Sequence, residues 1–581
     1  MNKTAELTLH LKSQKKCPVN GVHLFTPLLI VSVVSVLAQD GEVTVINGVS
    51  VPSDFPFVDV SILEETAAGK IFIANRWDSP YVMILENDGT PYFYKRLPWP
   101  TYDFKLHPTS TLTMRYGSPL YTWVELDSNY SVIYEFRSPG YSLDGHDIQL
   151  LPNGNYLVIV PHNRTVDMSQ LVEGGQSNAT LKENIIQELD RDQNVLFEWR
   201  SQDHFNVLDA VHEDLTADNI DYVHMNAIAV DYDDHLLISS RHLSEITKIN
   251  RQTGEIVWRL GGENNQFQFI NDEHGISYQH DIRPVTGYPN QYTLFDNGNH
   301  RTPLFSRAIE FQLDILNWTA TKVWEYRHSP DRYAKAWANA QRLPNGNTLI
   351  NWAVNSLPKA TEVTPDGEIV YEMDFVERFN TYRTFRFEWE SIVDIPYLVA
   401  ESHSDRVTLI FNKFGDNSVV EYRIYGGLDT NSEQLLANTS EPFIYLTELE
   451  NYQTYYFRVT AVDSNGNESD FSNEEEVLVS YSDLINIEHS NHLPANYKLY
   501  SNYPNPFNPS TMIKYQLPMT SDVDLSIYNL LGQKVATLVN ERQGIGIHQV
   551  AWDATRFSSS VYYYRIEAGE FQEVKNMILI K

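Results

Sequence analysis

Two segments in the middle of the chain decide the fold: VHMNAIAVDYDDHLLISSRHLSEITKINRQTGEIVWRLGG at residues 223–262 and QHDIRPVTGYPNQYTLFDNGNHRTPLFSRAIEFQL at residues 279–313. Each segment opens with a histidine, His224 or His280, and continues through a strand and a turn into another strand. Side chains alternate with the period of a β-strand, for example in residues 236–240. We therefore interpret the segments as consecutive copies of one β unit, with each histidine in a loop just before a strand.

The same unit recurs between Gly69 and Asp374. Six copies can be counted, and several have a turn at Asn-Gly or Asp-Gly, such as Asn153-Gly154 and Asn345-Gly346. Short strands joined by such turns are typical of propeller blades rather than of solenoid coils. In a propeller the innermost strand of each blade lines a central channel, so residues that are distant in the sequence meet there. The sequence predicts an all-β protein with a six-bladed β-propeller.

Length and charge limit the classes of function. A chain of 581 residues is too long for one compact core and is expected to contain several domains. The formal net charge of -33 argues against nucleic-acid binding, because phosphate binding needs a basic surface.

The N-terminus has the pattern of a secretory signal. Lysines precede an apolar run at residues 28–37, and a small-residue cleavage site ends at Ala38. The run is shorter than the roughly 20 residues that a membrane span requires, so we expect cleavage and no membrane span afterwards. An uncleaved anchor is the alternative. Cleavage would remove Cys17, the only cysteine, so neither disulfides nor a cysteine nucleophile are expected.

Two β-sandwich domains are predicted after the propeller. Short alternating strands over about 395–479 resemble a fibronectin type III domain, and Leu449 and Tyr455 resemble its tyrosine corner. The expected divisions are a signal peptide (1–38), the propeller (39–390), the fibronectin type III-like domain (391–481), a polar linker (482–496) and a last domain (497–581).

The last domain closely resembles the C-terminal sorting domain of the type IX secretion system. The resemblance is carried by LYSNYPNPFNPST at residues 499–511, by IYNLLGQKV at residues 527–535 and by the YYYRI strand that begins at Tyr562. It implies a Gram-negative source, passage through the periplasm, contact with the type IX machinery, and release or attachment at the cell surface.

Three histidines at comparable positions of the repeated units are expected to meet in the channel: His146, His224 and His280, with Arg241 and Arg307 nearby. Arginine presents a planar fork of donors to an oxyanion, and histidine can act as donor, general base or nucleophile near neutral pH. The cluster therefore predicts a site for a small anion. The structural alternative is that these side chains cap strands or pair with the abundant Asp and Glu.

A metal site is a second alternative, because histidine is the commonest metal ligand. No HExxH motif supports it, and Ser239-Ser240 lies outside any GxSxG elbow. We expect neither a metal nor another cofactor, and we do not expect a serine hydrolase.

From Asp144 to Glu372 the order of motifs resembles the arylsulfotransferase family. The motifs are His224-Met225-Asn226, Ser239-Ser240-Arg241, the segment 254–262, Gln279-His280-Asp281 and Ser306-Arg307-Ala308. The resemblance implies transfer of a sulfuryl group from a phenolic sulfate ester to another phenol through a histidine, without a nucleotide donor (PAPS-independent). It also implies that His224, His280 and Arg307 hold the transferring group.

These residue types suit sulfuryl transfer. Arg307 would stabilise charge on the sulfuryl oxygens, and a histidine would protonate the departing phenolate. A neutral imidazole nitrogen would accept the sulfuryl group covalently. Four further polar side chains are expected to contact the substrate: Asn226, Arg241, Asp281 and Asn297.

One position departs from the family pattern. The family's covalent histidine is not found in the sixth unit: the position seven residues before Asn345, equivalent to His146 seven residues before Asn153, is Ala338. His146, from another blade, is the alternative nucleophile. Two other functions therefore stay open: a non-catalytic propeller that binds anionic glycans or sulfated phenols, and a hydrolase that passes the sulfuryl group to water.

Overall fold

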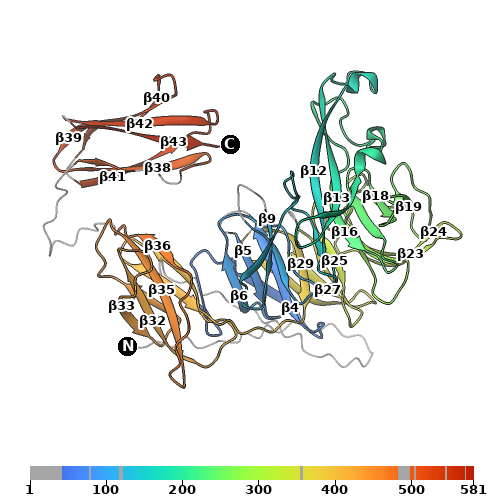
Figure 1. Ribbon diagram of the computed structural model, residues 1–581, viewed down its shortest axis with the longest axis horizontal. Helices are drawn as coiled ribbons and strands as arrows, with labels where there is room; N and C mark the ends of the chain where they lie inside the picture. The colour runs from blue at the N-terminus through green and yellow to red at the C-terminus, as the bar shows by residue number, and fades with distance from the viewer. Residues whose placement is uncertain are drawn as a thin grey trace, which may run out of the picture. The chain divides into compact units, whose positions relative to one another are not determined.

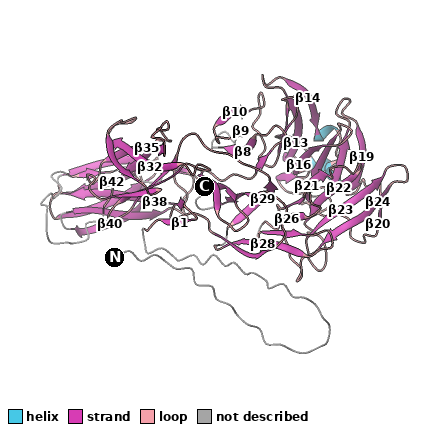
Figure 2. Cartoon of the chain, turned by 90° about the horizontal axis from the view of Figure 1, so that it is seen from below, coloured by secondary structure: helices cyan, strands magenta, loops and turns pink. Residues whose placement is uncertain are grey.

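The structure is a computed structural model that describes residues 42–76, 80–116, 122–353, 358–377, 379–481, 497–500, 502, 505–543, 546–569 and 571–580. The signal peptide and the linker predicted from the sequence lie outside these residues. The described part is all-β apart from three short 3-10 helices, η1 (Met168–Gln170), η2 (Ser201–Asp203) and η3 (Val207–Asp209), which confirms the fold class (Figures 1 and 2). Among the described residues, no helix has the length and apolar character of a membrane span.

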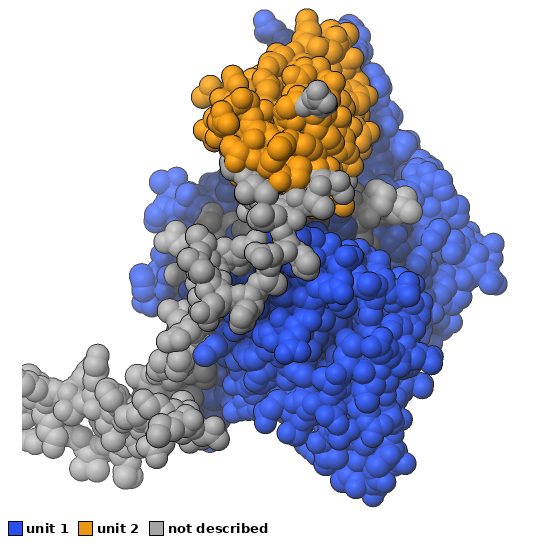
Figure 3. Space-filling view, turned by 90° about the vertical axis from the view of Figure 1, so that its left-hand side faces the viewer, with its two compact units in different colours: residues 1–482 blue, residues 483–581 orange. Residues whose placement is uncertain are grey.

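The chain divides into two compact units, Met1–Ser482 and Asp483–Lys581 (Figure 3). The first unit contains the sheets of the propeller. In chain order their strands are β3 (Val58–Leu63), β4 (Lys70–Arg76), β5 (Tyr81–Leu85), β6 (Pro91–Arg96), β7 (Phe104–Leu106), β8 (Leu112–Tyr116), β9 (Thr122–Leu126), β10 (Val132–Phe136), β11 (Ile148–Leu150), β12 (Tyr156–Val166), β13 (Ala179–Leu189), β14 (Val195–Arg200), β15 (Asn219–Asp221), β16 (Met225–Val230), β17 (Leu236–Ser240), β18 (Glu245–Ile249), β19 (Ile256–Gly261), β20 (Gln268–Ile270), β21 (His280–Pro284), β22 (Gln291–Asp296), β23 (Arg307–Asp314), β24 (Thr319–Tyr326), β25 (Asn339–Arg342), β26 (Thr348–Asn351), β27 (Ala360–Val363), β28 (Ile369–Phe375) and β29 (Asn380–Phe387).

In the described residues these strands form six sheets, ordered β29-β4-β5-β6, β7-β8-β9-β10, β11-β12-β13-β14, β16-β17-β18-β19, β21-β22-β23-β24-β20 and β25-β26-β27-β28-β3, with β15 beside β13. The first-named strands of neighbouring sheets contact one another, and the contacts run from β11 through β16, β21, β25 and β29 to β7. These six strands therefore line the channel of a propeller. Figure 1 also shows that the β12–β13 hairpin projects beyond its sheet.

The propeller is closed by strands from both ends of the domain. Strand β29 pairs with β4, so that Phe385 lies opposite Phe72. Strand β3 pairs with β28 on the outer side of another sheet. The sequence units begin at β4, yet the structure adds β29 as the inner strand of that first blade. Pairing of this kind leaves no open inner edge at the junction of the two chain ends.

Large aromatic side chains pack inside and between the sheets. Trp123, Trp199, Trp258 and Trp352 are all fully buried. The indole of Trp199 donates to the carbonyl of Gly254 in the next sheet at 3.0 Å, so its polar end is satisfied. These side chains, together with alternating Ile, Leu and Val, account for the stability of a domain that has no disulfide in its described part.

A β-sandwich follows in the same unit. Its sheets consist of β30 (Tyr397–Ser402), β31 (Val407–Asn412), β32 (Val419–Gly427), β33 (Leu435–Thr439), β34 (Phe443–Leu446), β35 (Thr454–Asp463) and β36 (Glu475–Leu478), preceded at the start of the chain by the hairpin β1 (Thr44–Ile46) and β2 (Val49–Val51). Asn412 of β31 accepts from the backbone N–H of Ser50 at 3.0 Å and donates to the hydroxyl of Tyr94 at 3.0 Å. The sandwich is thus hydrogen-bonded to the propeller.

The second unit is a separate β-sandwich. Its strands are β37 (Lys498–Leu499), β38 (Ser510–Leu517), β39 (Ser521–Tyr528), β40 (Lys534–Gln543), β41 (Gly546–Asp553), β42 (Ser560–Ala568) and β43 (Phe571–Leu579). Sheet β37-β38-β41 packs against sheet β40-β39-β42-β43 through a core that includes Trp552, Tyr564 and Leu525.

Candidate functional site

The predicted histidines meet at one end of the channel. His146 lies just before β11, His224 directly before β16, and His280 is the first residue of β21. These inner strands run in the same direction through the channel, so residues at their starts converge. The ring centroids of His146 and His224 are 5.1 Å apart. We call His146, His224, His242, His280 and Arg241 the histidine site.

Two of the imidazoles are held by carboxylates that are close in sequence. Nδ1 of His146 lies 2.5 Å from Asp144 Oδ1, and Nδ1 of His224 lies 2.8 Å from Asp221 Oδ2. Such a carboxylate favours the tautomer with the proton on Nδ1 and leaves the Nε2 lone pair for chemistry. In the described structure neither Nε2 has a hydrogen-bond partner.

Both carboxylates are held in the charged form. Burial opposes ionisation of Asp221, but the hydrogen bond and charge of His224 outweigh it and lower the pKa of Asp221 to about 2. Burial likewise opposes ionisation of Asp144, and His146 outweighs it, so the pKa of Asp144 is lowered. Each imidazole can therefore gain a proton during a reaction without losing its negative partner.

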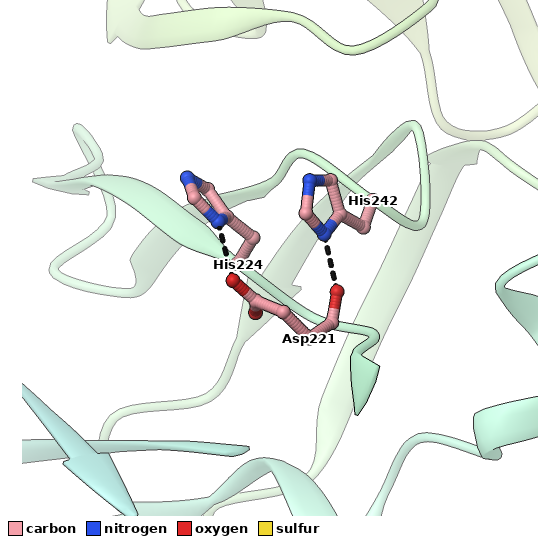
Figure 4. Close-up of side chains that lie close together, drawn as sticks. All are labelled: Asp221, His224 and His242. Carbon is pink, nitrogen blue, oxygen red and sulfur yellow. Dashed lines mark hydrogen bonds and ion pairs between the residues drawn. The ribbon is translucent and has the colours of Figure 1, made fainter. Parts of the chain in front are cut away.

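His242 is a site residue that the sequence prediction missed. Figure 4 shows its ring beside that of His224, with Nδ1 bonded to the backbone carbonyl of Asp221, and the ring centroids are 4.5 Å apart. Burial first, and the charge of His224 second, lower the pKa of His242 to about 3, so this ring is neutral at physiological pH. Its position directly after Arg241 was the signal available in the sequence.

Asp221, His224 and His242 place possible metal-ligating atoms within 4.8 Å of one another. However, Nη1 of Arg241 lies 2.5 Å from Nε2 of His242. Since a guanidinium can only donate, Nε2 carries the lone pair and Nδ1 carries the proton that is directed at the carbonyl of Asp221. Nδ1 is therefore unsuited to a metal, and the neighbouring guanidinium repels a divalent cation. The donor set fits an anion better than a metal.

Arg241 supplies the positive charge of the site. Its guanidinium lies 4.3 Å from the ring centroid of Tyr278, and Nη2 donates to the carbonyl of Lys335 at 3.2 Å. Its Nε is buried without a hydrogen-bond partner in the described structure. Burial removes hydration from the guanidinium and lowers the pKa of Arg241. An oxyanion in the site would stabilise this charge.

His280 has both ring nitrogens engaged. Nδ1 lies 2.7 Å from Asn297 Oδ1, and Nε2 accepts from the backbone N–H of Trp337 at 3.2 Å. The side chain is buried, and burial, followed by the charge of Arg241, holds its pKa well below the usual value. This arrangement suits a neutral ring that positions the loop at Trp337. It does not suit a nucleophile, because the lone pair of Nε2 is occupied.

Arg307 is directed away from the histidines. Its Nε donates to Asp296 at 2.9 Å, and both Nη atoms donate to Asp272, at 2.7 and 3.1 Å. The remaining donors reach Glu325 at 3.2 Å and the carbonyl of Gly275 at 2.7 Å. All five N–H groups of the fully buried guanidinium are thus engaged by protein acceptors. The geometry does not support the expectation that Arg307 holds a sulfuryl group.

The other three expected substrate contacts are buried structural groups. Nδ2 of Asn226 donates to the carbonyl of Gln279 at 2.8 Å, and the backbone carbonyl of Asn226 accepts from Arg383 at 2.8 Å. Asn297, which holds His280, also donates to the carbonyls of Ala334 and Trp337. Asp281 belongs to a set of buried charges beneath the histidines.

That set, the channel network, consists of Asp103, Asp147, Asp281, Lys105, Arg283 and Arg383. Nη1 of Arg383 lies 3.3 Å from carboxylate oxygens of both Asp103 and Asp147, and Nε lies 3.2 Å from Oδ1 of Asp281. Each of the three aspartates belongs to a different inner strand or to the loop before it. The guanidinium of Arg383 therefore links residues of three blades below the histidine site. Three cations and three carboxylates balance in charge, as deep burial requires.

Aromatic rings border the site on the side of His146. The ring centroid of Tyr102 lies 5.5 Å from that of Tyr382 and 6.4 Å from that of Trp337, and Tyr382 lies 5.7 Å from His146. Ala338 is fully buried with φ of 87°, so the sixth repeat contributes the Trp337 ring and a backbone N–H but no histidine. The site thus combines imidazoles, one arginine and an aromatic wall.

Comparison with solved structures gives only weak likenesses. A protein of unknown function from Bacteroides caccae is 12% identical, with a TM-score of 0.35 over 55% of this chain and 100% of that one. A streptogramin B lyase is 12% identical, with a TM-score of 0.29 over 61% of this chain and 94% of that one. A virginiamycin B lyase from Staphylococcus aureus is 12% identical, with a TM-score of 0.24 over 72% and 99%. No curated protein matches the chain.

Two family descriptions match parts of the sequence. Residues 116–376 match the model described as arylsulfotransferase (ASST). Residues 501–581 match the secretion system C-terminal sorting domain. The first range contains every residue of the histidine site, and the second lies within the separate unit at the C-terminus.

Proposed function

We propose that the protein is an exported aryl sulfotransferase, because residues 116–376 match the model described as arylsulfotransferase and residues 501–581 match the secretion system C-terminal sorting domain. It moves a sulfuryl group from a phenolic sulfate ester to another phenol through a histidine intermediate. The sorting domain indicates secretion or display at the cell surface.

The observation that carries this proposal is the pair of carboxylate-held imidazoles at the mouth of the channel. His146 and His224 both have Nδ1 on an aspartate and Nε2 without a partner in the described structure, and their rings lie 5.1 Å apart. Two such groups can divide the work of a transfer, one as nucleophile and one as proton carrier.

We assign the nucleophile to His224. It lies beside His242, whose Nε2 is 2.5 Å from Arg241, so the guanidinium is close to a sulfuryl group on His224. His146 lies beside Tyr102 and Tyr382, with ring centroids 6.0 and 5.7 Å away, where the aryl part of a substrate can pack. His146 is therefore the proton carrier for the phenolic oxygen.

In the first step, the Nε2 lone pair of His224 attacks sulfur and the bond between sulfur and the aryl oxygen breaks. Protonated His146 gives its Nε2 proton to the leaving phenolate, which departs as a phenol. Arg241 stabilises the charge on the sulfuryl oxygens, and Asp221 stabilises the cationic ring of sulfated His224. The role that the family resemblance implied for Arg307 passes to Arg241 in this assignment.

In the second step, the acceptor phenol gives its proton to neutral His146 and its oxygen attacks the same sulfur. The bond between sulfur and Nε2 of His224 breaks, which restores the starting imidazole. One ester and one phenol are consumed and one of each is formed. His280 stays neutral throughout and positions Trp337 through its hydrogen bond with the backbone N–H.

The test is incubation of the purified protein with p-nitrophenyl sulfate, with and without phenol, while nitrophenolate and intact protein mass are followed. We expect phenol-dependent release and a transient gain of one sulfuryl group on His224. His224→Asn should lower turnover by roughly 10³-fold or more and abolish the adduct. His146→Asn should lower turnover of p-nitrophenyl sulfate by roughly 10²-fold or more. The loss should be larger with phenyl sulfate, because phenolate is a poorer leaving group than nitrophenolate and depends more on protonation.

The matched control is His235→Asn, because His235 lies in a turn at the other end of β16. It should keep the wild-type rate. An unchanged rate in His224→Asn would overturn the assignment of the nucleophile. Phenol-independent release would identify a hydrolase, and tight binding without release would identify a binding propeller.

A further inference from the structure

The opposite end of the channel opens into a second cavity, of about 1460 Å³. Its wall includes the ends of inner strands and the turns after them, such as 106–108, 149–153 and 283–286. The histidines lie at the starts of the same strands, so the two sites face opposite ends of the propeller. The channel network separates them, and Lys105, Asp281 and Arg283 of that network form part of the cavity wall.

The charged groups of this cavity are paired within the protein. Nη2 of Arg342 lies 2.7 Å from Oε2 of Glu310, and Nη2 of Arg283 lies 2.6 Å from Oδ1 of Asp281. Arg251 is paired with Asp234 at 2.5 Å. A charged ligand would have to compete with these pairs, whereas a neutral ligand leaves them intact. The cavity therefore differs from the histidine site, where the Nε of Arg241 lacks a partner.

Uncharged polar groups in the wall are available for hydrogen bonding. In the described structure no partner is bonded to Oε1 of Gln149, Nδ2 of Asn153, the side chain of Gln291 or the hydroxyl of Tyr288. One carboxylate oxygen of Glu310, Oε1, is also without a donor, although the side chain is buried. Together these atoms offer both donors and acceptors at several points of the wall.

Aromatic surface accompanies these polar groups. Tyr288 is 61% exposed. Trp324 is half-buried, with its indole N–H bonded to the carbonyl of Pro365 at 3.0 Å and the guanidinium of Arg342 over its ring, 4.6 Å from the centroid, so that one face of the ring is left for packing. Phe385 and Phe387 lie deeper in the wall. Flat aromatic faces next to amide and hydroxyl groups suit the alternating C–H and O–H surface of a sugar ring. The volume exceeds the roughly 300–1,000 Å³ of pockets for single small ligands.

From these observations we propose that the cavity at the ends of the inner strands binds a neutral oligosaccharide. The ligand packs on Tyr288 and Trp324 and exchanges hydrogen bonds with Gln149 and Gln291. Because the protein is exported, extracellular or cell-surface polysaccharide can reach this cavity. Binding there would hold the protein on a polysaccharide while the histidine site at the other end stays open.

The experiment measures binding of neutral hexasaccharides (cellohexaose, xylohexaose, maltohexaose and mannohexaose) to the full chain by isothermal titration calorimetry. A heparin hexasaccharide serves as the anionic counterpart. At least one neutral hexasaccharide should bind with one saturable site, and Tyr288→Ala and Gln149→Ala should each weaken it at least about tenfold. The control Trp99→Ala removes an aromatic residue that is 51% exposed and lies outside the cavity, and it should change nothing.

Failure of this proposal is distinguishable from failure of the proposed sulfotransferase. Tyr288→Ala should keep wild-type turnover of p-nitrophenyl sulfate, and His224→Asn should keep wild-type binding of the hexasaccharide. The proposal is overturned if no neutral hexasaccharide binds, if only the heparin hexasaccharide binds, or if binding survives both cavity variants.

Discussion

Arg241 and Arg307 illustrate how surroundings decide the role of a residue. Both are arginines in motifs of the same repeat frame, and both were expected near the anion. Arg307 is surrounded by Asp272, Asp296 and Glu325. Burial opposes its charge, but Asp272 and Asp296 outweigh burial and raise the pKa of Arg307. Arg241 has an aromatic ring and a neutral imidazole as neighbours. Only Arg241 has donors left for a substrate, while Arg307 links three segments of one blade.

This difference leads to a stability prediction for Arg307→Met. The variant removes the guanidinium from two buried carboxylates: Asp296 keeps its pair with Arg301, but Asp272 keeps only Lys322, at 4.0 Å. The free energy of unfolding should therefore fall by roughly 3–5 kcal/mol. Urea unfolding measures this loss. The control is Arg137→Met, whose side chain is 58% exposed in its pair with Glu135 and should cost less than about 1 kcal/mol. If Arg307→Met keeps the wild-type stability but loses turnover, the assignment of Arg307 as a structural residue is wrong and Arg307 acts in the reaction.

Glu245 predicts a pH effect on stability. Its carboxylate is 2% exposed and accepts from Thr247 at 2.6 Å, and burial raises its pKa from 4.5 to about 7. The folded state binds this proton more tightly than the unfolded state does. The associated stability is therefore present below pH 4.5 and is lost as the pH rises through 7, on the order of 3 kcal/mol by pH 8.

The variant Glu245→Gln should accordingly be more stable than the wild type at pH 8, with a smaller difference at pH 5. Guanidinium unfolding at the two pH values measures it. Glu255→Gln, at an exposed turn before β19, is the matched control and should show no such pH dependence. Equal gains at both pH values would contradict a raised pKa for Glu245.

At the scale of elements, a short loop before β25 covers the histidine site. Asn297 donates to the carbonyls of Ala334 and Trp337 at 2.8 and 3.1 Å and also holds His280. Trp337 has φ of 66°, a conformation that a bulky side chain adopts only where its surroundings impose it. The inner strands thus position the imidazoles, and this loop positions the aromatic wall.

Asn297→Ala tests this positioning role. Without the amide, the loop and His280 lose their shared anchor, so kcat should fall by roughly 10-fold or more while KM for p-nitrophenyl sulfate changes less. Steady-state kinetics on the full chain separate the two constants. Asn317→Ala, in an exposed turn after β23, should keep both constants. A rise in KM alone would instead mean that Asn297 contacts the substrate.

At the scale of the whole molecule, the propeller depends on contacts between its two ends. Strand β29 completes the sheet that begins with β4, and residues of β29 also provide Arg383 and Tyr382 to the channel. The C-terminal unit, in contrast, is compact by itself. Removal of different lengths from the C-terminus should therefore have very different consequences.

A chain that ends at residue 481 should keep the thermal unfolding midpoint of the propeller and the turnover of p-nitrophenyl sulfate. A chain that ends at residue 376 lacks β29, so it should lose the cooperative transition and turnover. Circular dichroism on heating and the nitrophenolate assay measure both. A cooperative, active chain ending at 376 would show that closure by β29 is dispensable.

The repeats and the sorting motif were readable from sequence because they depend on local patterns. Alternating apolar side chains and turn residues recur along each blade. They predict an all-β propeller without knowledge of the contacts between blades. The frames of His146, His224 and His280 also predict that the three histidines meet, because equivalent positions in successive blades share the channel. Asp144 and Asp221 lie two and three residues before their histidines, so a search for nearby carboxylates would have found them.

Local sequence patterns alone predict the all-β class, the repeated unit, the convergence of three histidines and the sorting domain at the C-terminus. The three-dimensional arrangement shows which histidine nitrogens are occupied, which arginine keeps free donors, and that Arg383 lies 3.3 Å from Asp103 across the channel. These details depend on packing, because packing in three dimensions selects the partners of a buried charge. A carboxylate 280 residues away in the chain leaves no local sign in the sequence.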